Sequence, residues 1–262
     1  MFAGARMACV VAARSVTSKA GTSADSRGTA ASAQDRPGTP ESRSPRMSDP
    51  GGMLRGSDSI AGEWLAMAKV IADISVSLDG FVTGPRPDQE HGLGIGGEGL
   101  HTWAIAGDAI DNEVLSDTVD ATGAVIMGRR LFDIVDGPHG WSDEMGYGAR
   151  AVGQQPVLVV TRTPPDVVRL ADRFTFVVDG VVSAVSKAIA LADDRDVVVM
   201  GGAEVIRGCL EAGLLDELRL HLSPVLLGSG TPLFAAGTTP RTLRQIHVRA
   251  SGTATHLTYR VD

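Results

Sequence analysis

Three short segments combine residue types that suit a phosphorylated ligand. Gly128-Arg129-Arg130 follows the apolar run AVIM, and Thr161-Arg162-Thr163 follows PVLVV. Gly201-Gly202-Ala203-Glu204-Val205 follows DVVVM and opens a helical pattern. Arginine contacts phosphate through paired N–H groups, and glycine lets the backbone N–H groups of a helix N-terminus approach an anion. The sequence therefore predicts an anion site made of three turns, each at the end of a strand.

A fourth glycine-rich segment, GLGIGGEGL at 92–100, contains the G-x-G-x-x-G spacing of a dinucleotide-binding turn. That motif acts only where it follows a buried strand and opens a helix. The preceding GPRPDQEHGL makes no buried strand, and HTWAIAGD after it is a weak helix start. We therefore expect a loop between the first strand and the first helix, whose glycines give hinge freedom to a lid.

Apolar runs alternate with helical patterns along most of the chain. Strands are expected over 69–77, 81–83, 124–128, 156–160, 174–178 and 196–200. Helices are expected within 105–117 and over 181–192 and 203–213, where apolar residues recur at three and four. This order is typical of an α/β domain with a mainly parallel sheet.

The last third of the chain changes to a period of two. Leu218, Leu220 and Leu222 alternate with Arg219 and His221, and the alternation continues around 246–248 and 257–261. These segments are expected to be antiparallel strands at one edge of the sheet. The alternation also predicts that His221 lies on a surface or an interface. Three other histidines, His91, His101 and His139, show no metal-ligand spacing. Trp103 and Trp141 could stack on a ligand, but burial in the core is the favoured interpretation.

Composition and charge restrict the classes of function. The chain has 262 residues and a formal charge of −7, and residues 67–262 carry 16 basic and 25 acidic residues. An acidic domain argues against a nucleic-acid partner, and no apolar run approaches the roughly 18 residues of a membrane span. Cys9 and Cys209 provide neither a disulfide framework nor a zinc spacing. We therefore expect a cytoplasmic protein without a metal site.

Residues 1–66 are rich in Ala, Gly, Ser, Thr, Arg and Pro and show no helical or strand period. They contain too few large apolar side chains to offset the entropy of ordering the chain. Two interpretations stay open: a disordered extension, or an upstream mis-assigned start. MAKVIADISVSLDG, which begins at Met67, looks like an ordinary first strand. The folded domain is expected over 67–262.

Five strings in this order resemble the dihydrofolate reductase-like superfamily: SLDGF (77–81), VIMGRRLFD (125–133), VVTRT (159–163), VVVMGGAEV (197–205) and DELRLHLSPVLLGSGTPLF (216–234). More narrowly, they resemble the reductase domain of bacterial riboflavin biosynthesis and its stand-alone relatives. The resemblance runs from about Lys69 to Asp262. It implies a three-layer α/β fold, a mostly parallel sheet with antiparallel C-terminal strands, and a homodimer.

The resemblance implies NADPH as the cofactor. In that family the turns that match 128–130 and 161–163 hold the adenosine 2′-phosphate and ribose. The turn that matches 201–205 meets the pyrophosphate. The arginines favour NADPH over NADH, because a 2′-phosphate binds a guanidinium group where a free hydroxyl would not.

Three carboxylates are the candidate catalytic residues. Folate-type reductases keep a carboxylate on the helix after the first loop, and Asp108 and Asp111 lie in the matching region without the usual proline–leucine–tryptophan pattern around them. Asp79 matches a position that the riboflavin-type reductases place at the substrate. Each has a structural alternative, since Asp79 precedes Gly80 in a turn and the other two are typical of solvated helix carboxylates.

The activity implied is hydride transfer from NADPH to a small pyrimidine or pterin-like heterocycle. The first expectation is the reduction of 5-amino-6-(5-phosphoribosylamino)uracil. Met200 replaces the pathway enzyme's usual glutamate before Gly-Gly, and no zinc-type deaminase domain accompanies the reductase. Two alternatives therefore stay open: a related reductase of another substrate, and an NADPH-binding dimer without catalysis.

Overall fold

The computed structural model describes residues 68–142, 146–147 and 155–262. The expectation for residues 1–66 lies outside the described residues. A disordered extension and a mis-assigned start therefore both stay predictions.

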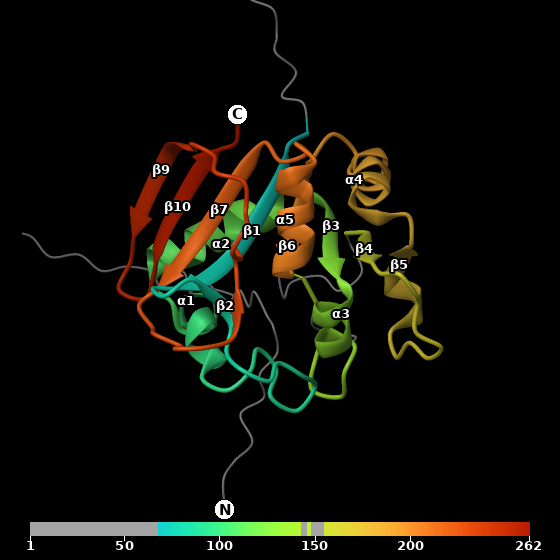
Figure 1. The fold of residues 1–262 in the computed structure, drawn as a ribbon, viewed down its shortest axis with the longest axis horizontal. Coiled ribbons are helices and arrows are strands. Elements are labelled where there is room, and N and C mark those ends of the chain that lie inside the picture. Colours follow the sequence, from blue (N-terminus) through green and yellow to red (C-terminus); the bar gives the residue numbers. More distant parts are fainter. Residues whose placement is uncertain (1–67, 143–145, 148–154) are drawn as a thin grey trace, which may run out of the picture. The chain divides into compact units, whose positions relative to one another are not determined.

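In the described part of the chain, eight strands form one sheet in the order β5-β4-β3-β6-β1-β7-β10-β9 (Figure 1). The first six strands in that order pair in parallel, and β10 pairs antiparallel with β7 and β9. The sheet strands are β1 (Val70–Ser77), β3 (Thr122–Gly128), β4 (Val157–Val160), β5 (Phe174–Val177), β6 (Asp196–Gly201), β7 (Glu217–Ser223), β9 (Arg244–Ala250) and β10 (Thr255–Arg260). A separate antiparallel pair joins β2 (Phe81–Thr83) to β8 (Thr231–Pro232). The expected mostly parallel sheet with antiparallel C-terminal strands is confirmed.

Helices cover both faces of this sheet and make three layers (Figure 1). On one face, α4 (Gly180–Leu191) and α5 (Ala203–Glu211) pack in a core with residues such as Ala72 and Val199. On the other face, α1 (Thr102–Ala106), α2 (Ala109–Ala121) and α3 (Arg129–Val135) pack in a second core with Val125 and Val198. Two short 3-10 helices, η1 (Gly97–His101) and η2 (Ala171–Arg173), complete the elements. Because both faces are covered, the central strands need continuous apolar runs, as their sequences show.

His221 is buried, with 3% of its surface exposed, so the expected surface or interface position is wrong. The strand β7 lies between β1 and β10. His221 lies on the face that α1 and α2 cover, where its ring contacts Trp103 of α1. A period of two separates the two faces of a strand but does not tell whether the polar face meets water.

The carboxyl ends of β1, β3, β4 and β6 lie at one edge of the sheet because these strands run parallel. The turns 128–130, 161–163 and 201–205 each follow one of these ends. Ligands of open α/β sheets bind at this edge. The fold therefore gathers the three arginine- and glycine-containing turns as the sequence predicts.

Candidate active site

The turns after β3, β4 and β6 contact one another. The Nη1 of Arg129 donates to the carbonyl oxygen of Thr163 at 2.6 Å, which ties the turn after β3 to the turn after β4. Arg130 Nη1 lies 3.7 Å from Glu204 Oε1 on the first turn of α5. A Cβ added to Gly128 would lie 3.4 Å from the backbone nitrogen of Gly202. The three turns therefore form one continuous surface.

Backbone donors and a free cation are available on this surface. Gly202 is the N-cap residue of α5 and provides no side-chain hydrogen bond to the first turn of the helix. The first turn of a helix carries unpaired N–H groups and a positive dipole end. Arg162 is exposed, and its guanidinium has no hydrogen bond or ion pair with the described residues. These are the features that an anionic ligand requires.

A cavity of about 60 Å³ lies between the sheet and helices α1 and α2. Its apolar wall includes Leu115 of α2 and Val198 and Met200 of β6. Its polar wall is made of Asp73, Ser75, His101, Trp103, Thr118 and His221, together with Tyr147. Met200 directly precedes Gly201, so the strand that carries the glycine turn also forms one wall of the cavity.

Asp73 is the charged group in this cavity. Its Oδ1 is 2.9 Å from Nε2 of His221, and its Oδ2 is buried without a hydrogen-bond partner among the residues that the structure describes. Burial opposes ionisation, but the charge and hydrogen bond of His221 hold the pKa of Asp73 below its usual value. An unpaired buried acceptor is costly. A ligand N–H or O–H group in the cavity would satisfy it.

The remaining polar wall is neutral. Trp103 donates from Nε1 to Ser75 Oγ at 2.9 Å. Burial and the neighbouring His221 lower the pKa of His101 to about 4, so this ring is uncharged at neutral pH. Burial raises the pKa of Tyr147, which also exchanges a hydrogen bond with Thr122. Asp73 and the histidines of β7 and β10 are therefore the groups that set the charge beside the cavity.

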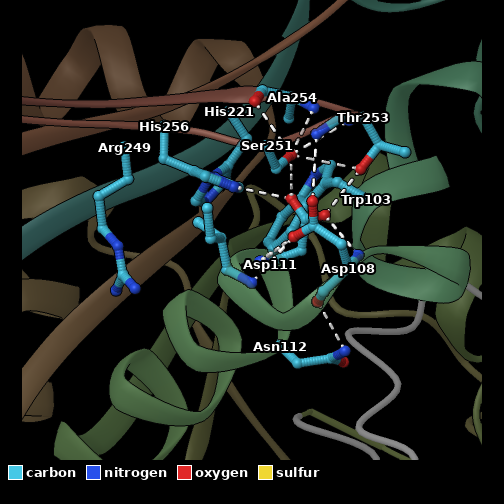
Figure 2. Close-up of polar contacts among 12 residues, drawn as sticks. Trp103, Asp108, Asp111, Asn112, His221, Arg249, Ser251, Thr253, Ala254 and His256 are labelled. Atoms are coloured by element: carbon cyan, nitrogen blue, oxygen red, sulfur yellow. Dashed lines mark hydrogen bonds and ion pairs between the residues drawn. The ribbon is translucent and has the colours of Figure 1, made fainter.

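A chain of hydrogen bonds runs from the cavity to the start of α2. His221 Nδ1 lies 2.7 Å from His256 Nδ1, and His256 Nε2 lies 2.9 Å from Asp111 Oδ1. Asp111 is completely buried and also accepts from the hydroxyls of Ser251 and Thr253 (Figure 2). Burial opposes ionisation of Asp111, but these hydrogen bonds and the N–H of Asp108 keep its pKa below the usual value.

The structure gives the three candidate catalytic residues different surroundings. Asp79 is exposed and accepts hydrogen bonds from the Ser77 hydroxyl and from the N–H groups of Leu227 and Gly228. Asp108 caps α2 by accepting from the N–H groups of Ile110 and Asp111. None of the three lines the cavity. Asp111 alone is linked to it, through His256 and His221.

Sequence reasoning missed Asp73 and His256 and misplaced His221. A signal was present, because Asp73, Ser75 and Ser77 interrupt an otherwise apolar strand at a spacing of two. Polar residues on one face of a fully buried strand need partners, and such residues mark candidate sites.

The 92–100 segment runs into the short 3-10 helix η1 and the five-residue helix α1, so it is not followed by a dinucleotide-type helix. It forms a compact loop, in which Gly84 N–H donates to Leu93 and Ile95 N–H donates to Pro85. The backbones of Gly84, Gly94 and Ile95 approach too closely for a side chain at either glycine. Its glycines therefore permit close packing, and its role as a lid stays a prediction.

The RibD C-terminal domain family model matches residues 68–257, and the chain belongs to this family. The chain is 26% identical over 180 residues to the uncharacterized protein YyaP of Bacillus subtilis (strain 168), covering 65% of this chain and 82% of YyaP. It is 24% identical over 194 residues to YwjB, also an uncharacterized protein of Bacillus subtilis (strain 168), covering 73% and 97% of the two chains.

A solved structure shares the fold. It is a protein of Shewanella sp. PV-4 that has been assigned to riboflavin biosynthesis, with a TM-score of 0.55 and 22% sequence identity. The match covers 74% of this chain and 99% of that chain. Together with the family membership and the three-layer sheet, it confirms the dihydrofolate reductase-like α/β fold expected from the sequence.

Among the residues that the structure describes, no helix is long and apolar enough to cross a membrane. No group of three or more His, Cys, Asp or Glu among them could hold a metal ion. The carboxylates and imidazoles beside the cavity instead bind one another.

Proposed function

We propose that the protein is an NADPH-dependent reductase of a small pyrimidine or pterin-like heterocycle. The observation that carries the proposal is the position of Met200, which borders the cavity and directly precedes the Gly201-Gly202 turn. A heterocycle beside Asp73 and a dinucleotide along the three turns would then approach each other at the end of β6. The ribosylaminouracil reduction of riboflavin biosynthesis is the first substrate to test.

The residues present fit the cofactor. Gly202 has no atom within 4 Å of an added Cβ, which leaves room for a pyrophosphate at the N-terminus of α5, while Gly128 lets β3 approach this turn closely. Arg162 is free for a 2′-phosphate, with Arg129 and Thr161 supporting its turn. When bound, the nicotinamide supplies the hydride. The chain's part is to hold both ligands and to keep water out.

The cavity suits a planar ligand that carries N–H groups. Asp73 Oδ2 is free to accept an N–H, as a carboxylate does from an aminopyrimidine edge. Leu115, Val198 and Met200 provide an apolar wall that excludes water. The proposal therefore assigns the carboxylate at the substrate to Asp73. Asp79 and Asp108 already hold backbone N–H groups in place.

The test begins with cofactor binding. The full chain is titrated with NADPH and with NADH, and the absorbance at 340 nm is then followed with the phosphoribosylaminouracil and with dihydrofolate. We expect tighter binding of NADPH and turnover with a heterocycle of this class. Absence of NADPH binding would overturn the proposal. Binding without turnover on any heterocycle would instead favour the non-catalytic cofactor-binding dimer.

A matched pair of variants locates the substrate. Asp73→Asn keeps the size of the side chain and removes the charge, whereas Asp172→Asn makes the same change on an exposed carboxylate of η2. The proposal expects that only Asp73→Asn impairs turnover and that neither variant changes NADPH affinity. Equal activity of the two variants would remove Asp73 from the site.

A further inference from the structure

Three consecutive hydrogen bonds connect a partly buried carboxylate, Asp73, to a fully buried one, Asp111, through two buried imidazoles. The links are Asp73 Oδ1 to His221 Nε2 at 2.9 Å, His221 Nδ1 to His256 Nδ1 at 2.7 Å, and His256 Nε2 to Asp111 Oδ1 at 2.9 Å. They come from β1, β7, β10 and α2, and His256 points from β10 toward Asp111 in Figure 2. Only Asp73 and His221 border the cavity.

The number of protons in this chain follows from its geometry. Each link is a hydrogen bond and therefore contains one proton, so the four side chains hold three. With both carboxylates ionised, all three protons are on ring nitrogens. Two neutral imidazoles carry only two protons, so one ring of the pair is an imidazolium. The arrangement keeps three protons whichever of the four groups carries the extra one.

We propose that His221 and His256 share a single proton across their Nδ1 atoms and form the proton store of the cavity. His221 is the better place for the charge. Its ring lies over Trp103 with centroids 4.1 Å apart and ring planes inclined by 32°, within cation–π distance, and it lies beside the Asp73 carboxylate. In agreement, burial and the charge of His221 lower the pKa of His256.

Other titratable groups around the pair fit this charge state. Asp73 faces it from β1 and Asp111 from α2, while Arg219 of β7 and the neutral His101 and Tyr147 complete the surroundings. The two carboxylates favour one imidazolium. A second proton would place two N–H groups against each other across the 2.7 Å contact. The pair therefore holds one extra proton and resists both its loss and the gain of another.

At its Asp111 end, the hydrogen-bond chain reaches the protein surface. Asp111 accepts from the hydroxyls of Ser251 and Thr253, which are only partly buried in the β9–β10 turn (Figure 2). Asp111 and His256 thus act through His221 and Asp73 and are positioning residues. A proton entering from solvent at the turn can replace one that leaves at the cavity.

The proton step balances as follows. As the His221 Nε2–H bond breaks, an O–H bond forms on Asp73, and the proton shared with His256 passes to His221 Nδ1. The Asp73 proton then forms a bond to a basic nitrogen or oxygen of the ligand, leaving Asp73 ionised. One proton from water re-enters through Asp111 and His256. The ligand gains one proton, the solvent loses one, and no electron moves.

The first test counts protons and needs no turnover. In full-length protein labelled with ¹⁵N-histidine, ring nitrogens of His221 and His256 are assigned with His221→Gln and His256→Gln and observed in the wild type at pH 7. We expect both Nε2 atoms protonated and one further proton on the Nδ1 pair, three in total. A total of two protons, one in each neutral ring and none between the Nδ1 atoms, would overturn the proposal.

The second test asks whether the store serves the cavity, and it rests on the proposed function. His256→Gln should lower turnover about tenfold or more at pH 8 and less at pH 6, where solvent supplies protons readily, with KM and NADPH affinity unchanged. His247→Gln, on the exposed strand β9, is the control. A wild-type pH profile in His256→Gln would overturn the relay. Failure of the wild type to bind NADPH would overturn the proposed function. The proton count would then still decide whether His221 and His256 share a proton.

Discussion

Arg129 fastens two turns together: its Nη1 donates to the carbonyl oxygen of Thr163 at 2.6 Å, while its Nε holds Asp133 at 2.8 Å. The same guanidinium is thus used within the protein, whereas Arg162, which directly precedes Thr163, has no partner among the described side chains. Arg129 and Arg162 therefore have different roles on this surface. Arg129 sets the geometry, and Arg162 is available to a ligand.

This difference predicts different losses on substitution. Arg162→Ala should weaken NADPH binding about 10- to 100-fold and leave NADH nearly unchanged, because a charge-assisted contact contributes about 1.5–3 kcal/mol. Arg129→Ala should weaken both cofactors, because it releases the turn that both use. Binding titrations measure the effect, with the exposed Arg241→Ala as control. Equal loss of NADPH and NADH in Arg162→Ala would remove the 2′-phosphate assignment.

Substitution of Asp73 should impair the reaction of the heterocycle without changing the affinity for NADPH. Asp73→Asn removes a buried charge that accepts from His221 and is free at Oδ2. We expect kcat/KM for the heterocycle to fall about 10- to 100-fold, the range for a hydrogen bond to a charged group. Steady-state kinetics and a separate NADPH titration make the comparison. A parallel loss of NADPH affinity would indicate damage to the fold and not loss of a substrate contact.

Acid should destabilise the protein through His101, which is partly buried, and His256, which is buried. An unfolded histidine titrates near pH 6.5, whereas His101 in the folded protein has a pKa of about 4 and that of His256 is also lowered, both through burial first. As the pH falls from about 6.5 toward 4, the unfolded chain binds protons that the folded protein does not, so the free energy of unfolding falls. His101 alone contributes at most about 3 kcal/mol.

Urea denaturation at pH 7.5, 6.0 and 5.0 measures this dependence. His101→Gln should flatten it, and His139→Gln, at an exposed position, should not. Unfolding free energies that are independent of pH between 7.5 and 5.0 would contradict the assigned burial of these rings.

The two carboxylates at the start of α2 should respond differently to alanine. Asp108→Ala removes a helix cap and should cost about 1 kcal/mol, with cofactor binding retained. Asp111→Ala leaves His256, Ser251 and Thr253 without their acceptor in a buried place and should cost several times more. Thermal and urea unfolding measure both, with Asp120→Ala on the exposed face as control. A strong loss of turnover in Asp108→Ala at unchanged stability would restore it as a catalytic residue.

Local patterns were sufficient to predict the strands of the large sheet, helices α2, α4 and α5 and the three turns, but not helix α3. Val197–Val199 and Val157–Val160 are continuous apolar runs, which only strands buried on both faces require, and each ends in a residue type that permits a tight or anion-binding turn. The meeting of the turns at one edge of the sheet then follows from the parallel arrangement. The homodimer and the cytoplasmic location expected from the sequence stay predictions.

The polar wall of the cavity could not be predicted in the same way. His221 and His256 belong to strands β7 and β10, whose alternation identifies two faces but not the helix that covers one of them. The partners of these side chains lie far along the chain, since Asp73 is 148 residues from His221 and Asp111 is 145 residues from His256. The first pair is set by the pairing of β1 with β7 and the second by the packing of α2 on the sheet, and no local pattern encodes either.

The double membership of Met200, as cavity wall and as the residue before the Gly201-Gly202 turn, has a thermodynamic consequence. A ligand that shifts the end of β6 at one site changes the shape of the other through a single peptide unit. Any such coupling is reciprocal, so the factor by which the dinucleotide alters the affinity of the heterocycle equals the factor in the opposite direction. Met200, which borders the cavity next to that turn, is a natural spectroscopic probe of the order in which the ligands bind.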